Sequence, residues 1–367
     1  GKGYVQLLDE HYKDYSRLFN RVSLNGKELA SHDGGYSTYH VNLTDGLMDE
    51  NELEIKVDNS PNDHVYPQKA DFTFYGGLYR DVRLITVPKN HFDLDYYGGK
   101  GFYVTPEVKE DGSAEVRFDA YVCGDADEIS VLVNGDSGSQ SVTLYIPEDD
   151  TQTIYDEDAL CGIRHYTGTL IIDNPHLWNG LKDPFLYTAV AELKKNGDII
   201  DEVTTKFGCR NYYFDPEKGF FLNGESYPLR GVSRHQDRMG VGNALTKEMH
   251  EEDMELILSV GANSIRLAHY QHDQYFYDLC DERGMVVWAE IPYISEHMPG
   301  GRENTISQMR ELIVQNYNHP SIVVWGVSNE ITISTKDKKD MLDNPHGNDV
   351  ALTFSIFLSV YPQKSLT

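Results

Sequence analysis

The sequence predicts two β-sandwiches in series, followed by a unit in which strands and helices alternate as in a (β/α) barrel. Before residue 208, short runs of alternating polar and apolar residues are separated by turn dipeptides such as Asn25-Gly26, a pattern typical of antiparallel sheets. After Phe207-Gly208, strand-like runs alternate with segments of helical period, which favours parallel strands. The length of 367 residues fits two or three domains, each with its own core.

The two sandwiches are expected to meet at Pro88-Lys89-Asn90, because a strand ends there at a proline. The strands expected in the first sandwich are Val22–Leu24, Tyr39–Leu43, Glu52–Asp58 and Val82–Val87. Those expected in the second are Gly101–Val108, Ala114–Val122, Ile129–Val133, Gly168–Ile172 and Tyr187–Leu193.

The third unit opens with a hairpin, Phe220–Leu222 and Tyr227–Arg230 around Asn223-Gly224. A helix is expected after Thr246, a plausible N-cap, and two more at Gln274–Arg283 and Thr305–Tyr317. Strands are expected near 229–233, 263–267, 285–289 and 322–327. The last two are continuous apolar runs, as in parallel strands buried on both faces. Four strands make half of an eight-stranded barrel.

Composition excludes several classes of protein. Lys and Arg total 32 against 59 Asp and Glu, a formal charge of −27, so we expect no nucleic-acid partner. No apolar run reaches the length of a membrane span, so we expect no membrane partner. The four cysteines form no CxxC or Cys/His cluster, fit neither a disulfide scaffold nor a zinc site, and most are expected to be core thiols. The many aromatic residues fit either ordinary sandwich cores or sugar platforms.

Ionisable and amide side chains follow every predicted strand of the third unit. They are Arg234, His235 and Asp237 after the first strand, Arg266, His269 and His272 at the second, Glu290 after the third, and Asn329 and Glu330 after the fourth. Because strand C-termini open on one face of a (β/α) barrel, these side chains are expected to converge on one pocket.

This set of residues suits acid/base chemistry on a neutral polar substrate, since no glycine-rich phosphate loop or serine elbow accompanies it. Glycoside hydrolysis requires one carboxylic acid to protonate the glycosidic oxygen and a second carboxylate to attack or to activate water. Glu330 is the best candidate for the acid because it follows an apolar strand, where burial favours the protonated form. A helix N-terminal acid without catalytic role is the alternative for Glu330.

Several motifs resemble the glycoside hydrolases of family 2, most of all the β-galactosidases. The barrel motifs are 231–237 (GVSRHQD), 264–270 (SIRLAHY), 288–292 (WAEIP), 318–322 (NHPSI) and 325–330 (WGVSNE). Upstream, 22–27 (VSLNGK), 32–36 (HDGGY) and 75–82 (YGGLYRDV) are similar to the sugar-binding domain of that family. The resemblance implies a jelly-roll-like sandwich in 1–87, an immunoglobulin-like sandwich in 88–207 and a partial TIM (β/α) barrel in 208–367. It also implies retaining hydrolysis of a terminal non-reducing β-D-galactoside.

The resemblance assigns roles to individual residues. Glu330 matches the general acid/base, and Asn329 matches its neighbour that contacts the sugar 2-hydroxyl. His235 and His269 match histidines of the sugar pocket, Arg234 and Arg266 match arginines of the barrel floor, and Asp71 matches, more loosely, an acidic residue that reaches in from the first domain. His319 and Trp325 are expected to be structural. Some members hold magnesium after the third barrel strand, where Glu296-His297 lies here with imperfect spacing.

Two departures suggest that the chain is part of a longer protein: the first jelly-roll strands are not evident, and the nucleophile of the family would lie beyond Thr367. The tail Ala351–Thr367 also fits the family poorly. Glu290 is a remote candidate for the nucleophile.

A carbohydrate-binding module with a vestigial barrel is the alternative from another class of protein. β-Glucuronidase and β-mannosidase are alternatives within the family, the former disfavoured because the strand-end motifs contain no extra Lys or Arg. A cytoplasmic location is favoured over a periplasmic or secreted one, and a homo-oligomer stays open.

Overall fold

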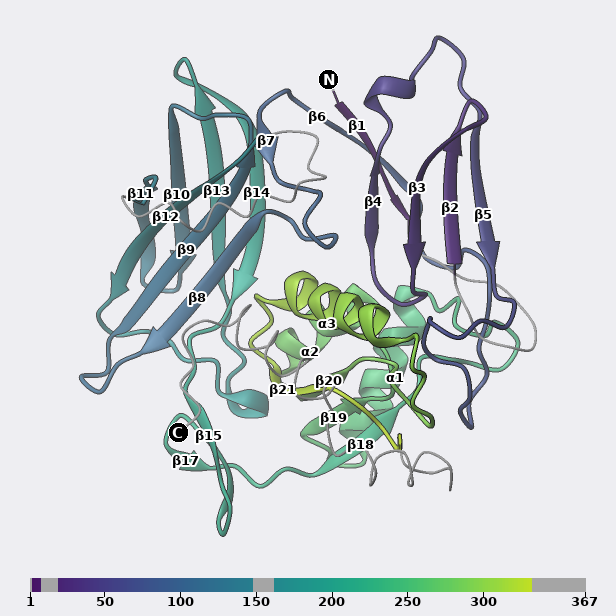
Figure 1. The fold of residues 1–367 in the computed structure, drawn as a ribbon. Coiled ribbons are helices and arrows are strands. Elements are labelled where there is room, and N and C mark those ends of the chain that lie inside the picture. Colours follow the sequence, from purple (N-terminus) through teal and green to yellow (C-terminus); the bar gives the residue numbers. More distant parts are fainter. Residues whose placement is uncertain (1, 8–18, 148–161, 332–367) are drawn as a thin grey trace.

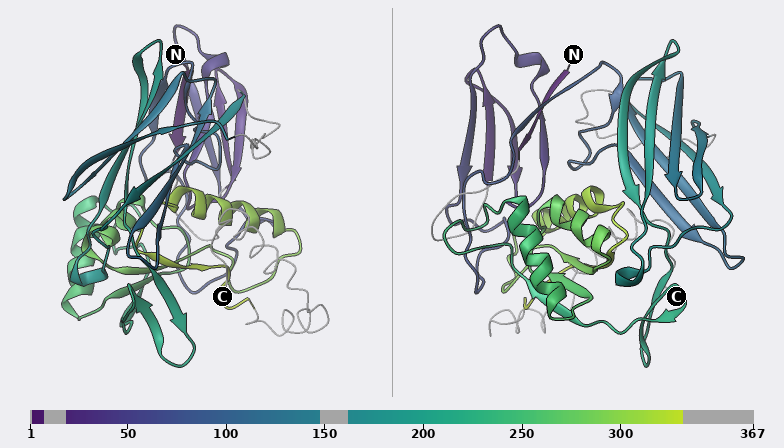
Figure 2. Two further views of the ribbon diagram at one scale, coloured as in Figure 1. Left: turned by 90° about the vertical axis from the view of Figure 1, so that its left-hand side faces the viewer. Right: turned by 180° about the vertical axis from the view of Figure 1, so that it is seen from behind.

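A computed structural model describes residues 2–7, 19–147 and 162–331. Two antiparallel sandwiches stand side by side, and the unit that contains the helices lies across one end of both (Figure 1). The view from behind shows the same arrangement, with the N-terminal sandwich and the second sandwich separated above the helices (Figure 2). The coarse fold predicted from the sequence is therefore confirmed, whereas the labels jelly-roll-like and immunoglobulin-like and the three domain boundaries stay interpretations.

The first sandwich packs the sheet β4-β1-β6 against the sheet β3-β2-β5. Its strands are β1 (Lys2–Leu7), β2 (Phe19–Leu24), β3 (Lys27–Asp33), β4 (Tyr39–Asn42), β5 (Leu53–Asp58) and β6 (Arg83–Val87). The turn between β2 and β3 is the expected Asn25-Gly26 hairpin, with φ angles of 52° and 77°. The core is small and centres on Val22, Leu24 and Val41.

The second sandwich has one sheet in the order β11-β10-β13-β14, and a second sheet in the order β12-β9-β7 with β8 paired to β9. Its strands are β7 (His91–Phe92), β8 (Phe102–Val108), β9 (Ala114–Cys123), β10 (Glu128–Gly135), β11 (Gly138–Leu144), β12 (Ile163–Ile172), β13 (Tyr187–Lys195) and β14 (Asp198–Phe207). Alternate residues of β9 are buried, because successive side chains of a strand face opposite sides of its sheet.

The third unit begins with the small sheet β15-β16-β17 and continues as a parallel sheet in the order β18-β19-β20-β21. Its elements are β15 (Tyr212–Asp215), β16 (Gly219–Leu222), β17 (Glu225–Ser226), β18 (Gly231–Arg234), α1 (Lys247–Ser259), β19 (Ser264–Leu267), α2 (Gln274–Arg283), β20 (Val286–Glu290), α3 (Arg302–Asn316) and β21 (Ile322–Gly326). The Thr246 side chain caps α1 by accepting a hydrogen bond from Met249 N, and Gly284 ends α2 with a φ of 72°. Both helix boundaries follow the sequence signals.

The first sandwich and the barrel unit share a core. Tyr66, in the segment between β5 and β6, is only 2% exposed and belongs to the hydrophobic cluster of the barrel strands. Its backbone N donates to Asn304 Oδ1 (2.9 Å), and its hydroxyl accepts from Met298 N (2.5 Å). Along α3, Glu311 accepts from His32 Nε2 (2.9 Å). The Tyr66 contacts hold the segment between β5 and β6 against the barrel unit, and the His32 contact joins β3 to α3.

Two expectations about the whole chain can be compared with the described residues. Cys209 and Cys280 are buried free thiols as expected, whereas Cys123 is disulfide-bonded, which the sequence did not indicate. Among the described helices, none combines the length and the apolar character that a membrane crossing requires. The predicted tail at 351–367 lies outside the described residues.

Candidate active site

The parallel register of β18 to β21 sorts the strand residues into two rows. Ser233, Arg266, Trp288 and Val324 are register partners in one row, and Arg234, Leu267, Ala289 and Trp325 are partners in the next. Because neighbouring residues of a strand face opposite sides, one row faces the inside of the sheet and the other faces the helices. Arg266 therefore lies on the inner side, whereas Arg234 lies on the helix side.

Glu290, at the end of β20, is the centre of the inner cluster. It is fully buried, and its Oε2 accepts from Arg266 Nε (3.1 Å) and Nη2 (2.9 Å). Its Oε1 accepts from His269 Nδ1 at 2.5 Å. The carboxylate is thus paired with a guanidinium and satisfied on both oxygens, as a buried charge must be.

Asn329 and Glu330 follow β21 at the same end of the sheet. Asn329 Oδ1 accepts from Arg266 Nη2 (2.7 Å), and its backbone is held by hydrogen bonds to Tyr293 O (2.9 Å) and from Ser295 N (3.0 Å). Glu330 has a φ of 54°, in the left-handed region. This unusual backbone conformation changes the direction of the Glu330 side chain relative to that of a regular strand. The Glu330 side chain is exposed among the described residues, so the burial expected for it is not observed there.

His235, directly after β18, lies among aromatic rings at the same end of the barrel unit. Its ring centroid is 5.2 Å from that of His269 and 4.7 Å from that of Phe72. Burial, followed by the nearby His269, lowers the pKa of His235, and the carboxylates of Asp237, Asp71 and Glu290 oppose this decrease. His235 Nδ1 is buried without a hydrogen-bond partner in the described residues. A neutral ring with a free nitrogen suits a hydroxyl-bearing ligand.

The segment between β5 and β6 of the first sandwich also lies near His235 and His269. Asp71 is exposed, and its charge acts on His235. The neighbouring Phe72 contacts His235, and its ring lies 5.9 Å from His269 and 5.5 Å from Tyr270. Sequence reasoning did not single out Phe72. Its position next to Asp71, in a segment rich in aromatic residues, was the available signal.

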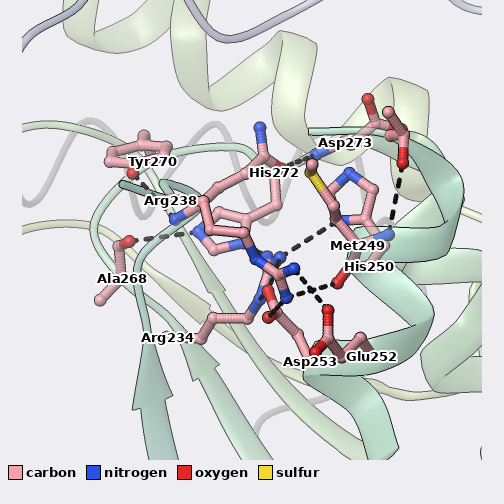
Figure 3. A network of polar contacts seen from close by, with 12 residues as sticks. Arg234, Arg238, Met249, His250, Glu252, Asp253, Ala268, Tyr270, His272 and Asp273 are labelled. Carbon is pink, nitrogen blue, oxygen red and sulfur yellow. Dashed lines mark hydrogen bonds and ion pairs between the residues drawn. The ribbon is translucent and has the colours of Figure 1, made fainter. Parts of the chain in front are cut away.

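Arg234 was expected to converge with the other strand-end side chains on one pocket, and the structure places it elsewhere. Its guanidinium donates to Asp253 Oδ2 (2.6 Å) and to the Nδ1 atoms of His250 and His272 (3.1 Å each), all on the helix side of β18. Figure 3 shows this network, together with Arg238, which pairs with the other oxygen of Asp253 (2.6 Å). The guanidinium also lies 3.9 Å from the ring centre of Phe276. These partners give Arg234 a structural position outside the inner cluster.

Glu296 and His297, where magnesium was considered possible, have other partners in the described residues. Glu296 Oε2 pairs with Lys69 Nζ at 2.8 Å, and His297 Nδ1 is hydrogen-bonded to the Tyr293 hydroxyl at 2.9 Å. Across residues 2–7, 19–147 and 162–331, no three His, Cys, Asp or Glu side chains are arranged to hold a metal ion. Magnesium prefers several oxygen ligands around it. Here Glu296 faces the Lys69 cation instead, and the ring nitrogen of His297 is hydrogen-bonded to the Tyr293 hydroxyl.

His319 and Trp325 lie away from the inner cluster, in line with their expected structural roles. His319 Nδ1 contacts Asp281 Oδ2 at 2.6 Å. Burial is the largest single effect on the pKa of His319 and lowers it, but the charge and hydrogen bond of Asp281, together with the charge of Asp278, outweigh burial and raise the pKa. Trp325 belongs to the helix-facing row and packs against the barrel core.

A strand-end cluster of carboxylate, imidazole and amide groups on a parallel sheet is typical of carbohydrate hydrolases. Comparison with known families makes this class specific. Residues 216–351 match the family model described as "Glycosyl hydrolases family 2, TIM barrel domain", and residues 100–210 match that described as "Glycosyl hydrolases family 2". The chain belongs to glycoside hydrolase family 2.

Individual relatives carry two activities in their names. The chain is 38% identical over 343 residues to a "Beta-glucuronidase" of Bacteroides fragilis, covering 88% of this chain and 46% of that protein. It is 27% identical to a "Beta-galactosidase" of Thermoanaerobacter pseudethanolicus, covering 93% and 46%. The crystal structure of an "FMN-binding beta-glucuronidase from Facaelibacterium prausnitzii L2-6" superposes with a TM-score of 0.84 at 39% identity, covering 99% and 53%. The chain thus spans about half the length of the relatives it matches.

Proposed function

We propose that the protein hydrolyses terminal β-D-glucuronides with retention of configuration, with Glu330 as general acid/base. The arrangement of Asn329 and His269 around the Arg266–Glu290 pair, with Glu330 directly after Asn329 in the chain, carries the proposal for the reaction. The name of the relative at 38% identity supports glucuronides over the galactosides that the sequence motifs favoured.

The lack of extra Lys or Arg at the strand ends of this chain does not exclude glucuronides as substrates. Relatives are about twice as long, so groups that bind the sugar carboxylate need not lie within the span compared. Charge at these strand ends is therefore a poor guide to the sugar.

In the proposed mechanism, Glu330 protonates the glycosidic oxygen as the bond to the sugar breaks. It then takes a proton from the water that releases the sugar. A retaining enzyme also needs a carboxylate nucleophile ~5–5.5 Å from the acid. Glu290 does not suit that role, because both of its oxygens are taken by Arg266 and His269 and the side chain is buried. We therefore expect the nucleophile to be another carboxylate elsewhere in the protein.

Hydrolysis of 4-nitrophenyl β-D-glucuronide, β-D-galactoside and β-D-mannoside by the full-length gene product tests the proposal. We expect the glucuronide to give the highest kcat/KM. Glu330→Gln should lower kcat by about 10²- to 10⁴-fold, because proton transfer is lost. Azide should partly restore turnover of this activated substrate by Glu330→Ala, since an anion attacks the glycosyl-enzyme without a general base. The matched control Glu296→Gln, a carboxylate held by Lys69, should stay close to wild type.

The outcomes separate chemistry from specificity. Wild-type turnover by Glu330→Gln would exclude the assigned role. A higher kcat/KM for the galactoside would favour β-galactosidase, the second candidate, which is the activity named for the Thermoanaerobacter relative. Binding of sugars without hydrolysis of any aryl glycoside would favour a carbohydrate-binding module.

A further inference from the structure

We propose that Glu290 is a positioning residue that sets the hydrogen-bond polarity of the sugar site. Through direct contact it makes His269 an acceptor, and through Arg266 it makes Asn329 a donor toward the substrate. The activity arm of the test below rests on the proposed hydrolase function, whereas the spectroscopic arm does not.

The polarity of His269 follows from its contact with Glu290. A carboxylate can only accept hydrogen bonds, so the proton at the 2.5 Å contact between His269 Nδ1 and Glu290 Oε1 belongs to the histidine. Arg266 already balances the charge of Glu290, so the cluster needs no second cation. A neutral ring with its proton on Nδ1 presents the Nε2 lone pair, which accepts from a hydroxyl.

The polarity of Asn329 follows from Arg266 by the same reasoning. A guanidinium has no acceptor, so the atom of Asn329 that faces Arg266 Nη2 at 2.7 Å must be the amide oxygen. The Nδ2 group is thereby turned away from Arg266 and can only donate. Two backbone hydrogen bonds, to Tyr293 O and from Ser295 N, hold the residue that carries this amide.

Arg266 is itself fixed, which allows it to transmit the orientation. Two of its nitrogens contact the same oxygen of Glu290, at 3.1 and 2.9 Å. Its guanidinium carbon lies 5.4 Å from the ring centre of Trp288. Without the Glu290 carboxylate, the guanidinium loses the group that determines where Nη2 points, and the Asn329 amide loses its fixed orientation.

The site therefore prescribes the pattern of its ligand: one sugar hydroxyl donates to His269 and another oxygen accepts from Asn329. Asn329→Asp tests this directly. An aspartate would still accept from Arg266, so folding should be retained, but it cannot donate. We expect kcat/KM on the preferred aryl glycoside to fall by about 10- to 100-fold with an unchanged thermal midpoint, a split that a purely structural asparagine would not show.

A double-mutant cycle on the full-length protein tests the coupling between Glu290 and Asn329, using whichever aryl glycoside is hydrolysed best. Glu290→Gln and Asn329→Ala should each lower kcat/KM by about 10- to 100-fold, and the double variant should be little worse than the poorer single variant. In the matched control cycle, Glu296→Gln and Asn329→Ala should have multiplicative effects. Multiplicative effects of Glu290→Gln and Asn329→Ala would overturn the transmission through Arg266.

The tautomer of His269 gives a readout that is independent of hydrolysis. With ¹⁵N-labelled histidine, the NMR signals of His269, assigned by their absence in His269→Gln, should show the proton on Nδ1. In Glu290→Gln this preference should be lost. An Nε2–H tautomer or an imidazolium in the wild type at pH 7.5 would overturn the proposal. A protein without glycosidase activity but with the expected tautomer would contradict the proposed function alone.

Discussion

Replacing Gly326 by alanine is expected to disrupt the site by displacing Glu290 and Trp288 on the neighbouring strand. Gly326 ends β21 beside Glu290 of β20. A Cβ at this position would lie 2.4 Å from Trp288 Nε1, 2.6 Å from Glu290 Cβ and 3.0 Å from Glu290 Oε2. Its φ is outside the left-handed region, so alanine meets no backbone strain. At an unconstrained site such a change stabilises a protein by ~0.4–1 kcal/mol.

The contacts determine the magnitude of the effect. Heavy atoms at 2.4–2.6 Å are more than ~1 Å inside ordinary carbon contact. The Glu290 side chain cannot move aside freely, because Arg266 and His269 hold both of its oxygens. Overpacking costs ~1–3 kcal/mol, and loss of a hydrogen bond to a charged group adds ~1.5–3 kcal/mol. We therefore expect a loss of about 3–5 kcal/mol in the free energy of unfolding.

Urea unfolding of the wild type and Gly326→Ala, followed by tryptophan fluorescence, measures this loss. Activity should fall as well, because displacement of Glu290 releases Arg266 and Asn329. Gly162→Ala is the matched control, since a Cβ there meets nothing within 4 Å and no unusual φ applies. If Gly326→Ala were as stable as this control, the tight packing between Gly326 and Glu290 would be refuted.

Two further predictions concern buried polar groups. Burial, followed by the charge of Arg234, lowers the pKa of His250 to about 4. The unfolded chain protonates His250 near pH 6.5, whereas the folded protein does so only near pH 4. The contribution of His250 to the free energy of unfolding is therefore fully present above pH 6.5 and falls by about 3 kcal/mol as the pH decreases to 4. Urea unfolding at pH 7 and pH 5 should show a shallower pH dependence for His250→Gln, and equal slopes would contradict this origin. Glu311 is 4% exposed and also accepts from Ser37 Oγ of the first sandwich. Glu311→Leu should therefore lower the free energy of unfolding by about 2–4 kcal/mol. It should also speed proteolysis of the segments where the first sandwich and α3 contact each other. The exposed control Glu303→Gln should change stability by less than ~0.5 kcal/mol, and equal proteolysis of both variants would speak against the contact.

The sequence predicted the strands that carry several apolar residues, and missed strands whose side chains are mostly polar. Strand β11 has the sequence GSQSVTL and is almost wholly exposed, so neither alternation nor apolar content marks it. Strand β3 and strand β14 also carry many exposed polar residues. Their positions follow from pairing with β2 and β13 across short Asn-Gly turns, so the turn dipeptides mark them better than their own side chains do.

Among the site residues, the sequence predicted which strand ends carry chemistry but not which side chains face inward. Arg234 and Arg266 belong to similar strand-end motifs, yet they are not register partners: Arg234 pairs with Leu267, and Arg266 with Ser233. Counting alternation along the same strand from the apolar Val232, which packs against the helix-side core, would have placed Arg234 on the helix side. The contacts of Glu290 with Arg266 and His269 could not be read from spacing, because they join different strands.

The two sandwiches also help to determine where the site residues lie, through the segment between α3 and β21. Asn318 Oδ1 accepts from Val104 N, and its Nδ2 donates to Thr205 Oγ1, each at 2.9 Å and both to the second sandwich. Arg210, just after that sandwich, donates from Nη2 to Ile322 O at 2.6 Å, at the first residue of β21. On the other side, Gln315 of α3 donates to Thr38 O of the first sandwich at 2.7 Å. Because β21 leads directly to Asn329 and Glu330, a shift of either sandwich would move the start of this strand. The contacts of Asn318, Arg210 and Gln315 with the sandwiches therefore help to position Asn329 and Glu330, although these contacts lie outside the site itself.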